Sequence, residues 1–307
     1  MTATFTGGIS FTGGVTFSLA PGGSKAIFGY GFGTGDTSIT NLVSNTGVVA
    51  TDTTGVGTTR YGLAAAGYGT DKAIFGYGVG ALYYSLTNLV SNTGIVANDT
   101  TGVGTARSYL AAAGYGTDKA IFGYGTTGGP GLVSMTNLVS NTGVVGNDVT
   151  GVGTARQGLA AAGYGTDKAI FGYGYNGTTY VAITNLVSNT GVVANDTSGV
   201  GTARRFLSAA GYGTDKAIFG YGTDNTNFSM TNLVSNTGVV ANDTTGVGTA
   251  RYGLAAAGYG TDKAIFGYGY GTDNVSMTNL VSNTGVVATD TTGVGTARRY
   301  IAAAAYG

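Results

Sequence analysis

Aspartate is the only acidic residue type in this chain, and most of its copies fall into two repeated patterns. In the first pattern an Asp stands in a turn directly before a lysine, and in the second it stands eight residues before an arginine, as Asp52 does before Arg60. Carboxylates in pairs can hydrolyse glycosides, and in groups they bind calcium. The regular spacing instead favours turn caps and Asp to Arg pairs between neighbouring strands. The two groups are Asp71, Asp118, Asp167, Asp215 and Asp262, and Asp52, Asp99, Asp148, Asp196, Asp243 and Asp290.

The residue types most used in catalysis are missing from the sequence. Without His or Cys, the chain has neither a Ser-His-Asp arrangement nor a cysteine nucleophile, and thiolate metal sites are excluded. Only Asp36, Asp224 and Asp273 lie outside the repeated patterns, and each stands alone in its own loop. No loop has the dense alternation of oxygen ligands that is typical of calcium loops. We therefore expect a protein that is not an enzyme and that uses no cofactor and no metal.

The composition argues against two further classes of partner. Charged residues make up 9% of the 307 residues, and the formal net charge is zero. Because nucleic-acid binders concentrate Lys and Arg, we expect no nucleic-acid partner. No apolar run approaches the roughly 18 residues of a membrane-spanning helix. The first ten residues, MTATFTGGIS, lack the basic and apolar regions of a secretory signal. We therefore expect no membrane insertion and no export by a signal peptide.

One motif, KAIFGYG, recurs along the whole chain without substitution. Between its copies run TNLVSNTG, then TGVGTTR or TGVGTAR, and then an alanine-rich segment such as 63–67. A fixed period in this range indicates a solenoid, a propeller or an array. The copies begin at Lys25, Lys72, Lys119, Lys168, Lys216 and Lys263, which are 47 to 49 residues apart.

Each period reads as four short strands separated by Gly, Asn and Asp turns. In one period these strands are 63–67, 72–78, 85–91 and 95–98. A parallel β-helix would need a rung about every 20–25 residues, and nothing repeats at half the period. Four antiparallel strands per period describe a propeller blade. The sequence therefore predicts an all-β chain that forms a single β-propeller over residues 1–307.

The strand at 72–78 carries apolar side chains on both faces. Strand alternation places Ala73, Phe75 and Tyr77 on one face and Ile74 on the other. Such a strand is packed on two sides. The alanine-rich strand is expected nearest the propeller axis, where only small side chains fit.

The chain ends predict how the ring closes. The sequence contains seven inner-strand segments, of which the first is 16–20 and the last is 301–306. Seven such segments suggest seven blades. Thr2–Gly8 aligns with KAIFGYG at Ala3, Phe5 and Gly8. The seventh blade would then be built by both termini, 1–20 and 299–307, with 9–12 as its third strand. The competing arrangement has six blades and an N-terminal arm.

The order of the motifs resembles the kelch type of β-propeller. In that family an Arg precedes an apolar inner strand, a second strand ends in a glycine doublet, and the outer strands carry a Tyr and a Trp. Arg60, the segment 63–67 and the end of KAIFGYG follow in this order, and the resemblance covers all six copies. Two features differ, because Gly29-Tyr30-Gly31 replaces the doublet and the chain has no Trp. The resemblance implies the architecture only, since kelch-like copper oxidases use ligands that this chain lacks.

Two segments differ between the copies, while the rest is nearly constant. They are the loop after KAIFGYG and the two residues after the Arg of TGVGTAR. In an antiparallel four-stranded blade both connections open on the same face. Variable aromatic loops on one face of a rigid ring are typical of a recognition surface, although unconstrained loops also drift. The candidate binding residues are Tyr61, Tyr83, Tyr84, Tyr109, Tyr175, Tyr180, Arg205, Phe206, Phe228, Tyr252, Tyr270, Arg299 and Tyr300.

The repeats are also similar to propeller arrays in virion proteins of tailed phages, such as fibres and decorations. Those proteins are commonly β proteins poor in cysteine, rich in Gly, Thr and Asn, and without signal peptides. The resemblance implies a virion component made in the host cytoplasm, in an assembly that can hold several copies. Its variable face would bind a host surface glycan or another virion protein.

The alternative is a free-standing lectin whose tyrosines stack on sugars. Artificial design is a third explanation for the near-identity of the copies. The unequal loop lengths instead favour duplication of a natural blade.

Overall fold

The first five residues of KAIFGYG form the middle strand of every sheet, because their apolar side chains are buried on both faces. The structure is a computed structural model that describes residues 24–129 and 131–307. In β4 only Lys72 is exposed, and the next four residues are buried. The strand predicted at 72–78 is confirmed, with its end two residues earlier. The middle strands are β1 (Lys25–Phe32), β4 (Lys72–Gly76), β7 (Lys119–Gly123), β10 (Lys168–Gly172), β13 (Lys216–Gly220) and β16 (Lys263–Gly267).

The alanine-rich segment forms the inner strand of each sheet. Neighbouring inner strands approach closely, since a Cβ on Gly67 would lie 3.2 Å from the carbonyl oxygen of Ala305. Small side chains therefore permit the packing at the centre, as the sequence predicted. The inner strands are β18 (Ala302–Tyr306), β3 (Ala64–Tyr68), β6 (Ala111–Tyr115), β9 (Ala160–Tyr164), β12 (Ser208–Tyr212) and β15 (Ala255–Tyr259).

The segment TNLV forms the third strand, and the predicted fourth strand is reduced to isolated bridges. One of these joins Val96 to Val90. Beside it the side-chain amide of Asn88 donates to the Ala97 carbonyl oxygen at 3.0 Å, so a side chain replaces a backbone donor of the ladder. Each sheet thus has three strands in the part of the chain that the structure describes. The third strands are β2 (Asp36–Val43), β5 (Thr87–Val90), β8 (Thr136–Val139), β11 (Thr184–Val187), β14 (Thr231–Val234) and β17 (Thr278–Val281).

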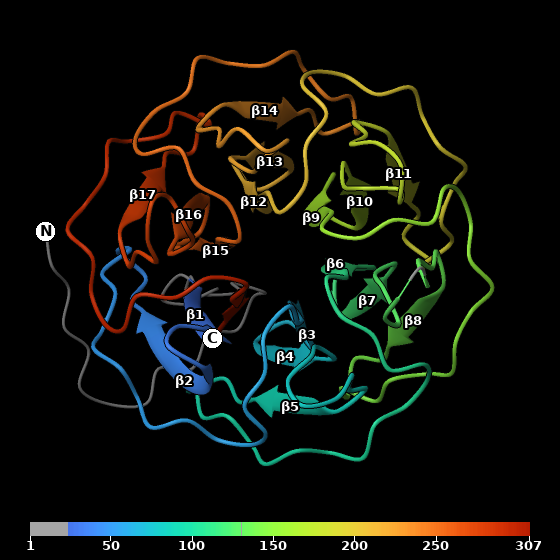
Figure 1. Ribbon diagram of the computed structural model, residues 1–307, viewed down its shortest axis with the longest axis horizontal. Helices are drawn as coiled ribbons and strands as arrows, with labels where there is room; N and C mark the ends of the chain where they lie inside the picture. The colour runs from blue at the N-terminus through green and yellow to red at the C-terminus, as the bar shows by residue number, and fades with distance from the viewer. Residues whose placement is uncertain (1–23, 130) are drawn as a thin grey trace, which may run out of the picture.

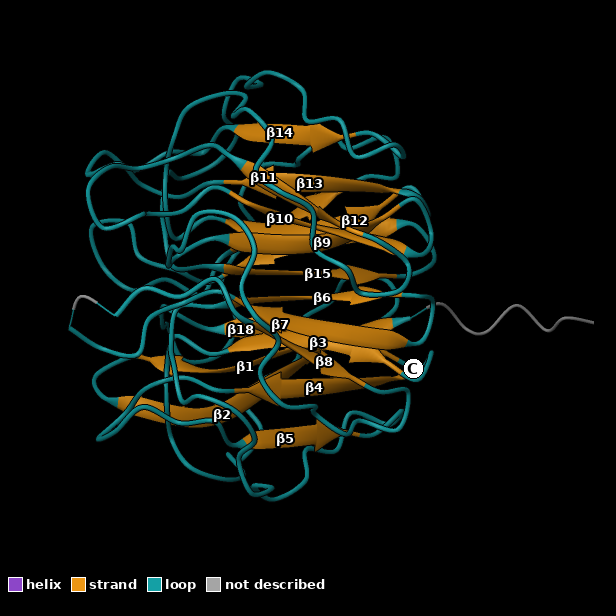
Figure 2. Ribbon diagram, turned by 90° about the vertical axis from the view of Figure 1, so that its right-hand side faces the viewer, coloured by secondary structure: helices purple, strands orange, loops and turns teal. Residues whose placement is uncertain are grey.

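Six sheets surround a common centre in a propeller-like arrangement (Figure 1). Each is antiparallel, with its inner strand nearest the centre, and the strands run along the short axis of the molecule (Figure 2). The described chain is all-β, as predicted, so it contains no apolar helix of membrane-spanning length. We number the sheets as first (β18-β1-β2), second (β3-β4-β5), third (β6-β7-β8), fourth (β9-β10-β11), fifth (β12-β13-β14) and sixth (β15-β16-β17).

The first sheet joins the two ends of the described chain. β18 pairs antiparallel with β1, so that Lys25 lies opposite Tyr306 and Gly29 lies opposite Ala302. The sequence predicted Thr2–Gly8 as this neighbour of the last inner strand, but β1 takes that place. The described residues thus form six sheets. The segment 1–20, assigned by the sequence either to a seventh blade or to an arm, lies outside the described residues.

The tyrosine of KAIFGYG lies on the opposite face from the one predicted. The backbone of Tyr77 is left-handed, with a φ of 66°, which reverses the strand alternation. Tyr77 therefore lies with Ile74, and its ring centroid is 5.1 Å from that of Phe122 in the next sheet. Equivalent Phe and Tyr rings fill the space between neighbouring sheets at all six junctions. These rings are core residues, as the sequence predicted for most tyrosines.

Candidate functional site

The two variable segments of each repeat lie side by side and pair through the backbone. The first residue after the buried Arg forms a bridge with the first residue after KAIFGYG. All six copies do this, so both segments open on one surface, which we call the variable face. This placement agrees with the alternation of turns expected from the sequence. The pairs are Tyr61 and Val79, Ser108 and Thr126, Gln157 and Tyr175, Arg205 and Thr223, Tyr252 and Tyr270, and Arg299 and Phe32.

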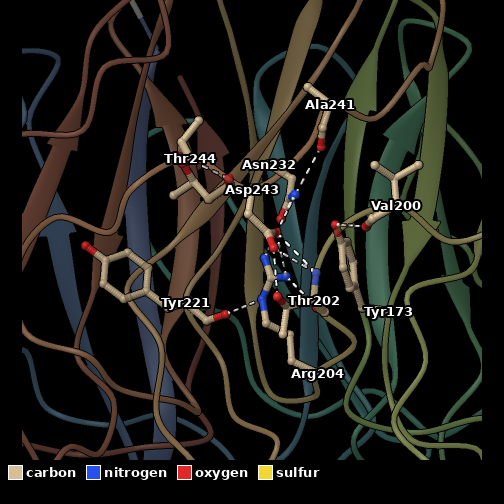
Figure 3. A network of polar contacts seen from close by, with 10 residues as sticks. Tyr173, Val200, Thr202, Arg204, Tyr221, Asn232, Ala241, Asp243 and Thr244 are labelled. Carbon is tan, nitrogen blue, oxygen red and sulfur yellow. Dashed lines mark hydrogen bonds and ion pairs between the residues drawn. The ribbon is translucent and has the colours of Figure 1, made fainter.

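A buried arginine anchors each variable segment to two neighbouring sheets (Figure 3). Arg204 is fully buried, at 0% exposure. Its Nε donates to the Tyr221 carbonyl oxygen at 2.7 Å, and its Nη2 donates to Asn232 Oδ1 at 2.7 Å. Its Cζ lies 4.5 Å from the centre of the Tyr173 ring, which belongs to the preceding sheet. Arg204 thus fixes where the segment 205–206 begins. The equivalent residues are Arg60, Arg107, Arg156, Arg251 and Arg298.

The aspartate of the second repeated pattern completes this network. Asp243 accepts hydrogen bonds from the Thr202 backbone N–H at 2.9 Å and hydroxyl at 2.7 Å, and its Oδ1 lies 3.9 Å from Arg204 Nη1. The predicted Asp to Arg pairing is confirmed, but the partner precedes Asp243 in the chain and is not Arg251, eight residues later. Partial burial acts to raise the pKa of Asp243, yet hydrogen bonds from Thr202 and Asn232 and the Arg204 charge lower it below its usual range.

Three aromatic side chains meet at the centre of the variable face. Tyr109, Phe206 and Tyr300, which we call the aromatic triad, have ring centroids 5.1 to 5.3 Å apart in every pair. The triad and residues of all six inner strands line a cavity of about 110 Å³. Burial raises the pKa of Tyr109 and of Tyr300 well above the ordinary value, so both hydroxyls stay neutral. The triad therefore presents a compact, uncharged surface at the axis.

Glycine alternates with the triad residues from one sheet to the next. A Cβ on Gly158 would lie only 3.0 Å from the Phe206 ring, so a glycine makes room for each ring of the triad. Phe206 itself has a φ of 55°, a left-handed conformation for which glycine is the ordinary choice. Three rings thus fill a space in which six would clash. The residues at this position, in chain order, are Gly62, Tyr109, Gly158, Phe206, Gly253 and Tyr300.

We expect Gly158→Ala to lower the free energy of unfolding by about 1–2 kcal/mol. The added Cβ crowds the Phe206 ring, and the φ of 65° at residue 158 disfavours alanine. Denaturant unfolding measures the change. Gly35→Ala is the matched control, because a Cβ there has nothing within 4 Å, and we expect a change below about 0.5 kcal/mol. Equal losses in the two variants would contradict the close packing of Phe206 on Gly158.

Further aromatic rings surround the triad. Tyr61 lies 6.0 Å from Tyr300 and 5.4 Å from Phe32, as measured between ring centroids. Tyr252 lies 6.1 Å from Tyr300 and 5.5 Å from Tyr270. The structure thus brings four predicted residues together and adds Phe32, which the sequence analysis missed. The signal was present, since Phe32 follows KAIFGYG at the same position as Tyr270.

Two half-buried arginines lie against this aromatic surface. The Cζ atom of Arg205 is 5.3 Å from the centre of the Tyr175 ring and 5.5 Å from that of Tyr180. The Cζ atom of Arg299 is 4.5 Å from the centre of the Tyr270 ring. At these distances a guanidinium is attracted to the ring faces. All five residues were predicted for the binding face. They form two cation–π sites, one around Arg205 and one around Arg299.

Tyr83, Tyr84 and Phe228 lie apart from this aromatic cluster. None of the three forms a ring-to-ring contact with another described residue. Tyr83 is 37% exposed, and its ring rests on Gly128 of the neighbouring loop. Tyr84 and Phe228 are half-buried. Tyr83 is therefore the most accessible of the predicted aromatic residues.

The opposite face is nearly identical in all six sheets. There Lys72 Nζ lies 2.8 Å from Asp71 Oδ1, and the Asn92 side chain donates to Asp71 Oδ2 at 3.1 Å, which confirms the turn role of the first Asp pattern. Tyr68, Lys72 and their equivalents line a cavity of about 380 Å³. Each sheet also exposes one aliphatic side chain on the turn after its third strand, such as Ile95 at 70%. This face carries little of the variation between copies, although Ser24 stands in the first sheet where the other sheets have the Asp of this turn.

The variable face offers aromatic surface and guanidinium groups, with little acid–base chemistry. Asp36 begins β2, and Asp224 and Asp273 lie in the loops of two other sheets. Across residues 24–129 and 131–307, no group of three or more His, Cys, Asp or Glu side chains is placed to hold a metal ion. Comparison of the chain with protein-family models and with curated proteins gave no match.

Proposed function

We propose that this protein is a non-enzymatic recognition component of a phage virion that binds a host surface glycan through its variable face. The observation that carries this proposal is the meeting of both variable segments on one face, where aromatic rings and two arginines gather. The rest of each repeat is nearly constant and forms the framework. Varied loops on a constant framework suit selection for binding.

We also propose that the framework is a single closed propeller of six blades. The pairing of β18 with β1 supports closure. So does the polar network at that junction, where Arg298 donates to the Tyr30 carbonyl oxygen at 2.8 Å and to Asn41 Oδ1 at 2.7 Å, as its equivalents do at the other junctions. In this proposal the isolated bridges mark the fourth strand of each blade. Closure holds the six variable loops at fixed separations, so that several of them can contact one ligand.

A glycan matches the chemistry of this face. The apolar face of a sugar ring packs against aromatic rings, and its hydroxyl groups bond to phenol and amide groups. Tyr61, Tyr252 and Tyr270 are half-buried, so their rings are held in place while part of each stays accessible. The low and balanced charge of the chain argues against a nucleic-acid ligand.

Glycan-array binding by the purified protein tests this proposal. Tyr61 and Tyr83 both bridge to Val79, so they lie on either side of one strand segment. We expect wild type to bind a surface polysaccharide and the double variant Tyr61→Ala with Tyr83→Ala to bind about tenfold more weakly or worse. Tyr83→Ala alone should weaken binding with little change in melting temperature, because Tyr83 is 37% exposed, whereas the loss of Tyr61 also removes its ring contacts with Phe32 and Tyr300.

Ile95→Ala on the opposite face is the matched control and should leave glycan binding unchanged. If wild type binds no glycan, or if Ile95→Ala weakens binding as much as the double variant, the variable face is not the binding surface. Cosedimentation with phage particles tests the virion assignment. Glycan binding without any association with particles would instead favour a free-standing lectin.

A further inference from the structure

Two of the eight arginines differ from the others in how their guanidinium groups are bound. All six Arg to Asp pairs among the described residues belong to the fully buried arginines, such as Arg204. Arg205 and Arg299, each next in sequence to a buried arginine, are half-buried. The Nε of each is buried and has no hydrogen-bond partner among the residues that the structure describes. These two side chains therefore do not serve the network that joins the sheets.

Both guanidinium groups are held by aromatic rings. The Cζ atom of Arg205 lies 4.8 Å from the centre of the Phe206 ring, in addition to its contacts with Tyr175 and Tyr180. The Cζ atom of Arg299 lies 5.5 Å from the centre of the Tyr300 ring. Both sites thus border the aromatic triad. A stacked guanidinium keeps its donor edge available, and that edge matches the two oxygens of a carboxylate.

The surroundings of Arg205 suit a sugar better than a free anion. The rings of Tyr175 and Tyr180 are 5.5 Å apart, so two aromatic surfaces lie beside one cation. The Tyr180 hydroxyl donates to Asn225 Oδ1 at 2.8 Å, which places an amide and a phenol at the same site. A small inorganic anion would use the guanidinium only. A sugar acid would use the guanidinium through its carboxylate, the rings through its apolar face and the polar groups through its hydroxyls.

We propose that Arg205 and Arg299 each bind the carboxylate of an acidic sugar, such as a uronic acid, in a host surface polysaccharide. This inference rests on the proposed glycan recognition and names its substrate class. Both sites adjoin the triad, so two acidic residues of one polysaccharide, or of neighbouring chains, are bound near the axis. Asp36, Asp224 and Asp273 on the same face do not pair with either arginine, since neither arginine is within 4.0 Å of any carboxylate in the described chain.

Calorimetric titration with oligogalacturonate, and with a neutral galactan as the comparison, tests this inference. We expect wild type to bind oligogalacturonate and to bind it more weakly as salt rises. Arg205→Gln and Arg299→Gln should each weaken binding about tenfold or more, and the double variant should bind too weakly to detect. Folding should be preserved, because Gln157 already occupies this position in the fourth sheet. Arg205→Lys should also weaken binding, since an ammonium group cannot form the two parallel bonds.

Several outcomes would overturn the acidic-sugar assignment while leaving glycan recognition intact. One is binding of the neutral galactan that is equal to oligogalacturonate binding and unchanged in the arginine variants. Another is binding of a sulfated galactan in the absence of oligogalacturonate binding. A third is a large fall in melting temperature in Arg205→Gln that Arg205→Lys restores, which would mark a structural role. If wild type binds no glycan on an array of neutral and acidic sugars, the proposed function fails as well.

Discussion

Arg204→Leu should lower the free energy of unfolding by about 3 kcal/mol or more, because it removes a buried charged group that joins two sheets. Without the guanidinium, Asn232 Oδ1 and the Tyr221 carbonyl oxygen lose their donor. Each buried polar group left unsatisfied costs about 1–3 kcal/mol. Asp243 also loses its nearest cation, and the Tyr173 ring loses the group stacked at 4.5 Å. Denaturant unfolding followed by circular dichroism measures the change.

Two variants show whether this loss comes from the junction between sheets. Arg298→Leu should be as destabilising as Arg204→Leu, because Arg298 makes the same contacts at the junction of the sixth and first sheets. Lys216→Met should cost less than about 1 kcal/mol, because the Lys216 side chain is 45% exposed and its ion pair with Asp215 lies in solvent. A similar loss in Lys216→Met and Arg204→Leu would contradict the role assigned to the buried network.

The sequence predicted the strands well because the repeat makes their boundaries visible. The apolar run that starts at Lys72 is bounded by turn residues in six copies, and the structure places a strand there in each. The small residues of 64–67 indicated the inner position, and the structure confirms it. The fourth strand was the least accurate prediction. Side-chain hydrogen bonds such as that of Asn88 interrupt its ladder, and strand patterns do not reveal them.

Backbone conformation accounts for the errors in side-chain direction. Tyr77 reads as a strand residue on the face of Phe75, but its positive φ turns it to the other face. Nothing in an alternating pattern signals a left-handed tyrosine between two glycines. The sequence also predicted Thr2–Gly8 as the neighbour of the last inner strand. Its resemblance to KAIFGYG is real, but β1 carries the complete motif and pairs with β18.

The candidate site was predicted as a set of residues and not as an arrangement. The variation between copies identified two segments, and the structure places both on one face. The triad could have been inferred from the alternation of Gly158 with Tyr109 and Phe206, because glycine next to an aromatic residue implies crowding at an axis. The different roles of Arg204 and Arg205 follow from their different burial, since Arg204 is fully buried and Arg205 is half-buried. Two adjacent arginines look alike in sequence, and only the fold places one in the network and the other against tyrosines.

Removing residues 302–307 should abolish cooperative folding, which is a larger effect than any single substitution. These residues include all of β18, which pairs with Lys25–Gly29 of β1 and contributes Ala302, Ala304 and Tyr306 to a buried cluster. Without them the first sheet loses its inner strand and the middle strand has an unpaired edge next to the centre. We expect the truncated protein to lack a sharp thermal transition and to be digested rapidly by protease, as measured by calorimetry and limited proteolysis.

Removal of residues 1–20 is the matched comparison, because its effect distinguishes a ring of six blades from a ring of seven. In a ring of six, β18 already supplies the inner strand beside β1, so the thermal transition should stay sharp and at nearly the same temperature. In a ring of seven, the first 20 residues would be needed to close the last blade. A collapse as complete as that caused by removing 302–307 would therefore contradict the six-bladed ring. A sharp transition that is kept when residues 1–20 are removed, and lost when residues 302–307 are removed, would locate ring closure at the pairing of β18 with β1.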